Sequence, residues 1–215
     1  MQLHPIDFNK NEDLAYLTSE VCRIARQTGV YLANERKNFT PDKVLEKHSH
    51  DYVSYVDREA EKMTVKALAN LLPEAGFITE EGTIEQSSEG LYWIIDPLDG
   101  TTNFIHDYAP YCVSIALRKE EELLIGVVYE VCRDECFYAW KGGKSYLNGK
   151  EIHVSKKRMD NAFIGLELPY EAEANKQAAK KVLDKLYGKV ASLRRSGSAA
   201  MDVGFVACGR YDGWG

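Results

Sequence analysis

The stretch Trp93-Ile94-Ile95-Asp96-Pro97-Leu98-Asp99-Gly100-Thr101-Thr102-Asn103-Phe104 decides how this sequence folds and where its chemistry lies. A short β-branched run bounded by turn residues is typical of a buried strand, so a strand is predicted up to Ile95. Pro97 lacks a backbone donor and is expected to end the hydrogen-bonded ladder, while Gly100 allows a close turn. Asp96 and Asp99 are therefore expected to emerge together at a strand end, beside the backbone amides that open the next element.

Two carboxylates held this close repel each other unless a cation lies between them. Mg²⁺ is usually bound through one or two carboxylates together with water and substrate phosphate. The free amides after Asp99 offer a place for an anion. An acidic β-turn, in which Asp and Gly serve turn geometry alone, accounts equally well for residues 96–99 taken by themselves.

The full twelve-residue string is more specific, and it resembles the first signature of the inositol monophosphatase family, within the lithium-sensitive, Mg²⁺-dependent phosphatase superfamily. The similarity extends from the first predicted helix to the last residue. Residues 102–104, Thr-Asn-Phe, favour this branch over the adenosine bisphosphate and histidinol-phosphate phosphatases. The resemblance implies an α/β fold, the layered α+β sandwich of the inositol monophosphatase and fructose-1,6-bisphosphatase type, with residues 1–215 in a single domain.

The composition is that of an ordinary globular protein, with 215 residues, 45% hydrophobic and 28% charged. A net charge of −6 argues against a nucleic-acid surface, but not against a phosphorylated substrate, because bound Mg²⁺ reverses the local potential. Residues 1–20 lack the pattern of a signal peptide and no run of about 18 apolar residues exists, so no membrane partner is expected. Five cysteines without framework spacing favour reduced thiols in a cytoplasmic protein.

Periodicity and turn residues predict the other elements. Helices are predicted at about residues 11–36, 57–72 and 171–187; strands at 76–81, where the strand ends in the paired glutamates, 112–117, 123–131, 135–140, 163–168 and 190–194; a strand or extended turn at 47–56. The three segments between 112 and 140 are expected to form an antiparallel meander, and Asn148-Gly149 predicts a hairpin turn.

Two further segments carry candidate site residues. Glu80-Glu81 before Gly82 is by itself an exposed acidic turn, but the resemblance implies that Glu80 faces the metal, with Glu81 as the alternative if the register is off by one. Residues 196–201, Ser-Gly-Ser-Ala-Ala-Met, open a helix whose amides are expected to be open to an anion; a simple helix start is the alternative.

The resemblance implies a role for each of these residues. The side chains of Glu80, Asp96 and Asp99 and the carbonyl of Leu98 are expected to hold two or three Mg²⁺ ions. The amides of Gly100 and Thr101, with Gly197, Ser198 and Ala199, are expected to bind substrate. Thr101 with Glu80 is expected to orient the attacking water, with Asp57 behind Thr101, although Asp57 also suits a helix N-cap. No motif for a serine or cysteine nucleophile is present.

The function expected from this resemblance is a Mg²⁺-dependent phosphomonoesterase for inositol monophosphate or a similar small polyol phosphate, acting as a homodimer. The alternatives are a 3′(2′),5′-bisphosphate nucleotidase, a fructose-1,6-bisphosphatase, or a non-catalytic protein that binds sugar phosphates or a protein partner. The family's second signature, Trp-Asp-x-Ala-Ala-Gly, supplies another metal-ligating aspartate and is absent up to Gly215. Asp212 does not replace it, so the fold is expected to lack part of its C-terminal half.

Overall fold

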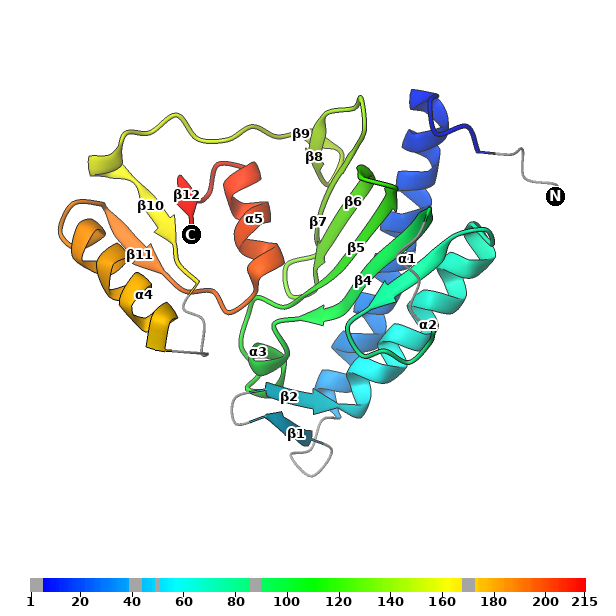
Figure 1. Cartoon of the computed structure of the whole chain (residues 1–215), viewed down its shortest axis with the longest axis horizontal. Coiled ribbons are helices and arrows are strands. Elements are labelled where there is room, and N and C mark those ends of the chain that lie inside the picture. Colours follow the sequence, from blue (N-terminus) through cyan, green and yellow to red (C-terminus); the bar gives the residue numbers. More distant parts are fainter. Residues whose placement is uncertain (1–5, 39–43, 49–50, 86–89, 168–172) are drawn as a thin grey trace.

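A seven-stranded sheet and the two long helices that cover it form the larger part of the structure (Figure 1). The computed structural model describes residues 6–38, 44–48, 51–85, 90–167 and 173–215. The sheet has the order β3 (Gly76–Thr79), β4 (Leu91–Asp99), β5 (Cys112–Lys119), β6 (Glu122–Glu130), β7 (Glu135–Trp140), β8 (Ser145–Leu147), β9 (Lys150–Glu151). Strands β3 and β4 are parallel, and every other neighbouring pair is antiparallel.

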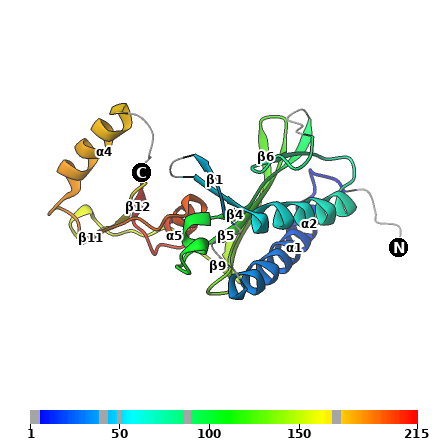
Figure 2. The ribbon, with the colours of Figure 1, turned by 90° about the horizontal axis from the view of Figure 1, so that it is seen from below.

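Helices α1 (Asn11–Lys37) and α2 (Tyr55–Leu71) lie side by side against this sheet (Figures 1 and 2). The inward face of α1 carries an apolar stripe at helical spacing, and Leu17, Val21 and Leu32 are fully buried. These side chains share one core with Trp93 and Ile95 of β4. The predicted amphipathic helix is therefore confirmed; α1 packs on β5, β6 and β7, while α2 packs on β4.

A smaller layer follows in the second half of the chain. Three parallel strands have the order β11 (Ser192–Arg194), β10 (Phe163–Gly165), β12 (Gly213–Trp214), and α5 (Ala199–Ala207) lies between them and the large sheet (Figure 1). The remaining elements are the hairpin β1 (Val44–His48) and β2 (Asp51–Ser54), the short helix α3 (Thr101–Ile105), a 3₁₀ turn at Met159–Asn161, and α4 (Glu173–Leu186). The predicted layered α/β architecture is confirmed. No helix of the described part is long and apolar enough to cross a membrane.

Several predicted boundaries differ from the structure. Helix α2 begins at Tyr55, so Asp57 lies in its first turn and the prediction of an N-cap at Asp57 is wrong. The predicted segment 47–56 divides among β1, β2 and the start of α2. The strands predicted at 163–168 and 190–194 contain three residues each, and α4 begins at Glu173, while residues 168–172 lie outside the described part.

Two turn predictions had different outcomes. Asn148 and Gly149 have φ of 47° and 82°, the left-handed values that an Asn-Gly hairpin requires, and β8 pairs with β9 across them. Pro97, in contrast, does not end the ladder: pairing between β4 and β5 becomes irregular after Asp96 and resumes where Asp99 faces Cys112. The missing backbone N–H of Pro97 thus produces a bulge in β4 and does not end the strand.

The close approach of α1 to β6 makes a first prediction. A Cβ atom on Gly29 would lie 2.3 Å from Cε1 of Tyr129. That ring is fixed, because its hydroxyl donates to Asp134 at 3.0 Å and Arg26 lies over its face at 5.1 Å. Gly29→Ala gains about 1 kcal/mol of helix propensity, but overpacking costs about 1–3 kcal/mol.

We therefore expect Gly29→Ala to lower the free energy of unfolding by about 1 kcal/mol net, measured by urea denaturation. The matched control is Gly126→Ala in β6, where an added Cβ meets nothing within 4 Å and stability is expected to stay the same or rise slightly. If the Gly29→Ala protein is as stable as the parent, the close approach of α1 to β6 at this position is contradicted.

Candidate active site

The end of β4 and the turn after it hold the predicted acidic pair. Asp96 Oδ1 accepts a hydrogen bond from the Leu98 amide at 3.0 Å, and the Leu98 carbonyl accepts one from Thr101 Oγ1 at 3.0 Å. Asp99 is the last residue of β4, and Thr101 is the first of α3. The structure thus confirms that both carboxylates lie at a strand end beside a helix start. It also fixes the Thr101 hydroxyl as a donor to Leu98, which leaves its lone pairs available as acceptors.

Gly100 is required at the turn between β4 and α3. Its φ is 93°, and a Cβ atom there would lie 3.0 Å from the Pro110 carbonyl oxygen. Both the left-handed conformation and the close backbone contact exclude a larger residue. The predicted tight turn is therefore confirmed, and it directs the backbone after Asp99 into α3.

Glu80 reaches this acidic pair from the neighbouring strand. Strands β3 and β4 are parallel with Thr79 opposite Ile95, so the residues that follow, Glu80 and Asp96, emerge side by side. The Glu80 amide donates to the Ile95 carbonyl at 3.2 Å. Burial raises the pKa of Asp96 well above its usual value, and the charges of Glu80 and Asp99 and a hydrogen bond with Glu80 raise it further. Such a shift marks carboxylates that are crowded together.

The neighbouring Glu81 faces a different partner. One of its carboxylate oxygens lies 3.9 Å from Arg58 Nε, and its amide donates to Glu61 Oε2 at 2.7 Å. Glu61 is fully buried on α2, and its other oxygen accepts from the Thr83 amide at 2.8 Å and the Thr83 hydroxyl at 2.6 Å. Of the two glutamates, the geometry favours Glu80 as the one directed at Asp96. Glu61, which the sequence analysis did not single out, holds the loop that carries it.

Asp99 is directed toward the start of α5. Its Oδ2 accepts hydrogen bonds from Ser198 Oγ at 2.7 Å and from the Ala200 amide at 2.8 Å, and Cys112 Sγ lies 3.8 Å away. The Ser198 amide donates to Ser196 Oγ at 3.1 Å. The predicted substrate segment therefore lies beside the acidic pair, but three of the amides expected to be open, those of Ser198, Ala200 and Met201, already donate within the protein.

Asn103 joins this segment to α3. Its Nδ2 donates to the carbonyl oxygens of Pro110 at 2.7 Å and Ser196 at 2.8 Å. Gly197, the next residue, has φ of 82°, and a Cβ there would lie 3.0 Å from Asn103 Oδ1. Ala199 is exposed at the first position of α5. Because these contacts are short, the turn at 196–198 and the helix after Asp99 are held together as one unit.

Asp57 is 3% exposed in the first turn of α2, which packs against β4. Burial of an acidic side chain at this point is compatible with a role in the site. Its predicted place behind Thr101 stays a prediction.

The acidic residues fit a magnesium ion only in part. Within residues 6–38, 44–48, 51–85, 90–167 and 173–215, no three His, Cys, Asp or Glu side chains are already arranged to hold a metal ion. Asp99 Oδ2 is engaged by Ser198 and Ala200, while the charges of Glu80 and Asp99 both act on Asp96, so a shared cage formed by these three side chains stays a prediction. Glu80 and Asp96 have the hard oxygen atoms that Mg²⁺ prefers, and Mg²⁺ usually takes only one or two carboxylates from a protein.

The fold is layered, acidic side chains lie at the ends of two parallel strands, and the start of a helix faces them. These features define an α/β protein with an acidic site at its strand ends. The sequence model of the inositol monophosphatase family matches residues 13–214, and the chain belongs to this family.

Individual relatives agree with this membership. The chain is 39% identical over 166 residues to an inositol-1-monophosphatase of Rhizobium meliloti, covering 76% of this chain and 62% of the relative. It is 38% identical over 197 residues to the Nus factor SuhB of Escherichia coli K12, covering 89% and 73%. The chain thus spans less than two thirds of the length of the Rhizobium relative.

Solved structures share the fold. The extragenic suppressor protein SuhB of Bartonella henselae matches with a TM-score of 0.83 at 33% identity, covering 91% of this chain and 76% of that one. The inositol monophosphatase of Thermotoga maritima matches with a TM-score of 0.79 at 26% identity, covering 88% and 72%.

Proposed function

We propose that this protein is a Mg²⁺-dependent phosphomonoesterase that hydrolyses inositol monophosphate or a similar small polyol or sugar phosphate. The observation that carries the proposal is the parallel register of β3 and β4, which brings Glu80 beside Asp96 directly before the Thr101 turn. Membership of the inositol monophosphatase family supports a phosphatase of this superfamily. The named polyol substrate, the set of two or three ions, the single domain over residues 1–215 and a homodimer rest on the family resemblance.

Different residues would bind the metal and the substrate during hydrolysis. Glu80, Asp96, Asp99 and the Leu98 carbonyl would supply the ligands for Mg²⁺. When bound, Mg²⁺ neutralises phosphoryl charge and lowers the pKa of water. Substrate oxygens lie against the amides of Gly100 and Thr101 and the start of α5, at Gly197, Ser198 and Ala199.

Thr101 and Glu80 then position the attacking water. The Thr101 hydroxyl donates to Leu98, so it accepts a hydrogen bond from that water, and Glu80 accepts the other. Asp57 supports Thr101 from behind. The water oxygen forms a new bond to phosphorus in line with the ester oxygen, whose bond to phosphorus breaks, giving inorganic phosphate and the free alcohol. Positioning of this kind places the reacting atoms at attack distance without a covalent intermediate.

The test is release of phosphate from inositol 1-phosphate with and without Mg²⁺, beside fructose 1,6-bisphosphate and adenosine 3′,5′-bisphosphate. Release from the polyol phosphate that requires Mg²⁺ supports the proposal. Preference for either bisphosphate identifies one of the two alternative phosphatases. If none of the three substrates is turned over, the proposed enzymatic activity is contradicted. That result would favour a non-catalytic protein that binds a protein partner, and some relatives are named Nus factors.

Thr101→Ala is expected to reduce turnover about 10²-fold or more, because the variant loses a hydrogen-bond acceptor for the attacking water. Mg²⁺ uptake, measured by calorimetry, is expected to be retained. Thr102→Ala is the matched control, since Thr102 is the exposed neighbour in the same helical turn. Equal losses in both variants would show that the turn, and not the Thr101 hydroxyl, matters.

A further inference from the structure

The short helix α3 carries Thr101 at its first position, and the proposed function needs the hydroxyl of this residue to stay in one place. At its start, α3 is tied to β4 because Thr101 Oγ1 donates to the Leu98 carbonyl at 3.0 Å. The helix has only 5 residues, and isolated helices shorter than about 12–15 residues are marginally stable in water. The far end of α3 therefore needs support from another part of the fold.

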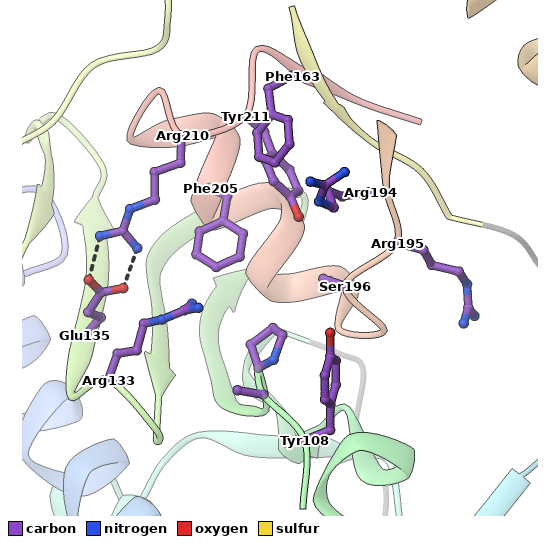
Figure 3. Close-up of a pocket in the computed structure, with 12 residues that line it drawn as sticks. Tyr108, Arg133, Glu135, Phe163, Arg194, Arg195, Ser196, Phe205, Arg210 and Tyr211 are labelled. Atoms are coloured by element: carbon purple, nitrogen blue, oxygen red, sulfur yellow. Dashed lines mark hydrogen bonds and ion pairs between the residues drawn. The ribbon is translucent and has the colours of Figure 1, made fainter. Parts of the chain in front are cut away.

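The loop after α3 faces open space on one side. Tyr108, Ala109 and Pro110 line a cleft of about 450 Å³, and Figure 3 shows Tyr108 at its edge, with Ser196 on the neighbouring wall. The Tyr108 side chain is 64% exposed. Atoms that border open volume lose dispersion contacts on that side. Packing across the cleft therefore contributes little to holding the end of α3.

Arg36, in the last turn of α1, holds the end of α3. Its Nη1 donates to the carbonyl oxygens of Phe104 at 2.8 Å and Ile105 at 3.2 Å, the last two residues of α3. Its Nε lies 3.5 Å from Asp107 Oδ1. A cation at the end of a helix satisfies carbonyls that have no partner within the helix, and hydrogen bonds from a charged donor are the stronger ones.

The guanidinium group of Arg36 is itself held in place. It lies over the ring of Phe104 at 5.6 Å, and this ring is fully buried and packs edge-on against Tyr111 at 5.3 Å. The side chain of Arg36 is only 20% exposed. Because α1 packs on β5, β6 and β7, the Arg36 contacts tie α3 to a long helix that is anchored in the main core.

We propose that Arg36 is a positioning residue for catalysis, which keeps the Thr101 hydroxyl in place for the attacking water by holding the other end of α3. A helix of one and a half turns moves as one piece, so a shift at Ile105 reaches Thr101. A displacement of about 1 Å at a reacting centre lowers the rate by about 10²-fold. The role of Arg36 in catalysis rests on the proposed phosphatase function, whereas its hold on α3 does not.

Hydrogen exchange of the metal-free folded chain tests the hold on α3 without any activity. Arg36→Met keeps a long apolar side chain and removes the guanidinium group. Three amides in and after α3 donate to carbonyls of residues 100, 102 and 103, and are expected to exchange about tenfold faster or more in this variant: those of Phe104, His106 and Tyr108. Arg26→Met is the matched control, because Arg26 lies earlier on α1 and bonds to Asp134 and Asn148. Exchange in and after α3 is expected to stay unchanged in this control.

Phosphate release with Mg²⁺ tests the role in catalysis. In Arg36→Met, kcat is expected to fall about tenfold or more while KM changes less than about threefold, because the Thr101 hydroxyl acts on the attacking water. Arg36→Lys keeps the charge but lacks the planar fork, so an intermediate kcat is expected. Guanidinium chloride at millimolar concentration is expected to raise the kcat of Arg36→Ala about threefold or more. It is expected to leave the parent and Arg26→Ala unchanged.

The outcomes separate positioning from general stability. Unchanged exchange at residues 104–108 in Arg36→Met would overturn the proposal, and so would faster exchange with an unchanged kcat, because Arg36 would then only stabilise α3. Equal losses of kcat in Arg36→Met and Arg26→Met would also overturn it. If the parent releases no phosphate, the proposed function fails, and exchange alone decides whether Arg36 holds α3. If Arg36→Met does not fold, the same comparisons are made with Arg36→Lys.

Discussion

Replacing Asp96 with asparagine is expected to lower Mg²⁺-dependent turnover by about a thousandfold or more while making the metal-free protein more stable. The loss follows because charge stabilisation by a metal is worth several kcal/mol, and each 1.36 kcal/mol corresponds to about a factor of ten in rate. The gain follows because Asp96 is a buried carboxylate crowded by Glu80 and Asp99. Asparagine keeps the size of the side chain and an oxygen that accepts the Leu98 amide, and removes the charge.

The stability change has a definite pH dependence. Burial, followed by the charges of Glu80 and Asp99, raises the pKa of Asp96, so the folded metal-free chain holds a proton that the unfolded chain releases. The stability contributed by this proton is complete below the unfolded pKa of about 3.9 and is lost as pH rises through the higher folded pKa. Urea unfolding of the metal-free parent is therefore expected to show this loss of stability as pH rises. Urea unfolding of Asp96→Asn is not expected to show it.

Added Mg²⁺ is expected to stabilise the parent and to leave Asp96→Asn unchanged, because a ligand stabilises only the state that binds it. Glu80→Gln is expected to behave like Asp96→Asn toward Mg²⁺. Glu81→Gln is the control, since Glu81 faces Arg58. If Glu81→Gln removes Mg²⁺ stabilisation and Glu80→Gln does not, the register of this loop is off by one residue.

The position of the site was predictable where local chemistry decides it. An apolar run followed by Asp-Pro-Leu-Asp-Gly indicates a strand end and a turn, and Gly100 is there because only glycine fits that turn. The pairing of Thr79 with Ile95 was not readable from local patterns, because parallel strands distant in sequence are aligned by packing. The choice of Glu80 therefore came from the family resemblance.

Other features escaped the sequence analysis because their partners lie far away in the chain. Whether the Ser198 and Ala200 amides are open depends on Asp99, about a hundred residues earlier. The prediction that Asp57 is an N-cap was wrong. Residue preference at a cap is a local signal, and Asp57 alone does not fix the start of α2, which lies at Tyr55. Glu61 did carry a signal: it follows Asp57 by one helical turn on the inward face of α2, where a charged residue requires a partner.

Glu61→Gln is expected to destabilise the protein by about 3 kcal/mol, because it removes a buried charged acceptor of three hydrogen bonds. Glutamine retains one acceptor oxygen, and its NH₂ group would face a donor from the amide of Glu81 or Thr83. The loop that carries Glu80 would then shift. A displacement of about 1 Å at a reacting centre lowers the rate by about 10²-fold.

The measurement separates the two consequences. Urea unfolding reports stability, while Mg²⁺ affinity of the folded variant, measured at low temperature where the native state is populated, reports the position of Glu80. Glu59→Gln is the matched control on the same helix, since Glu59 is exposed and bonds only to Lys62 among the contacts described; a change below about 0.5 kcal/mol is expected. A Glu61→Gln protein that is destabilised but binds Mg²⁺ as the parent does would limit Glu61 to a structural role. A loss of affinity in the folded variant, absent in Glu59→Gln, would show that Glu61 positions Glu80, because in the described part of the chain neither Glu61 nor Glu59 is hydrogen-bonded to Asp96, Leu98 or Asp99.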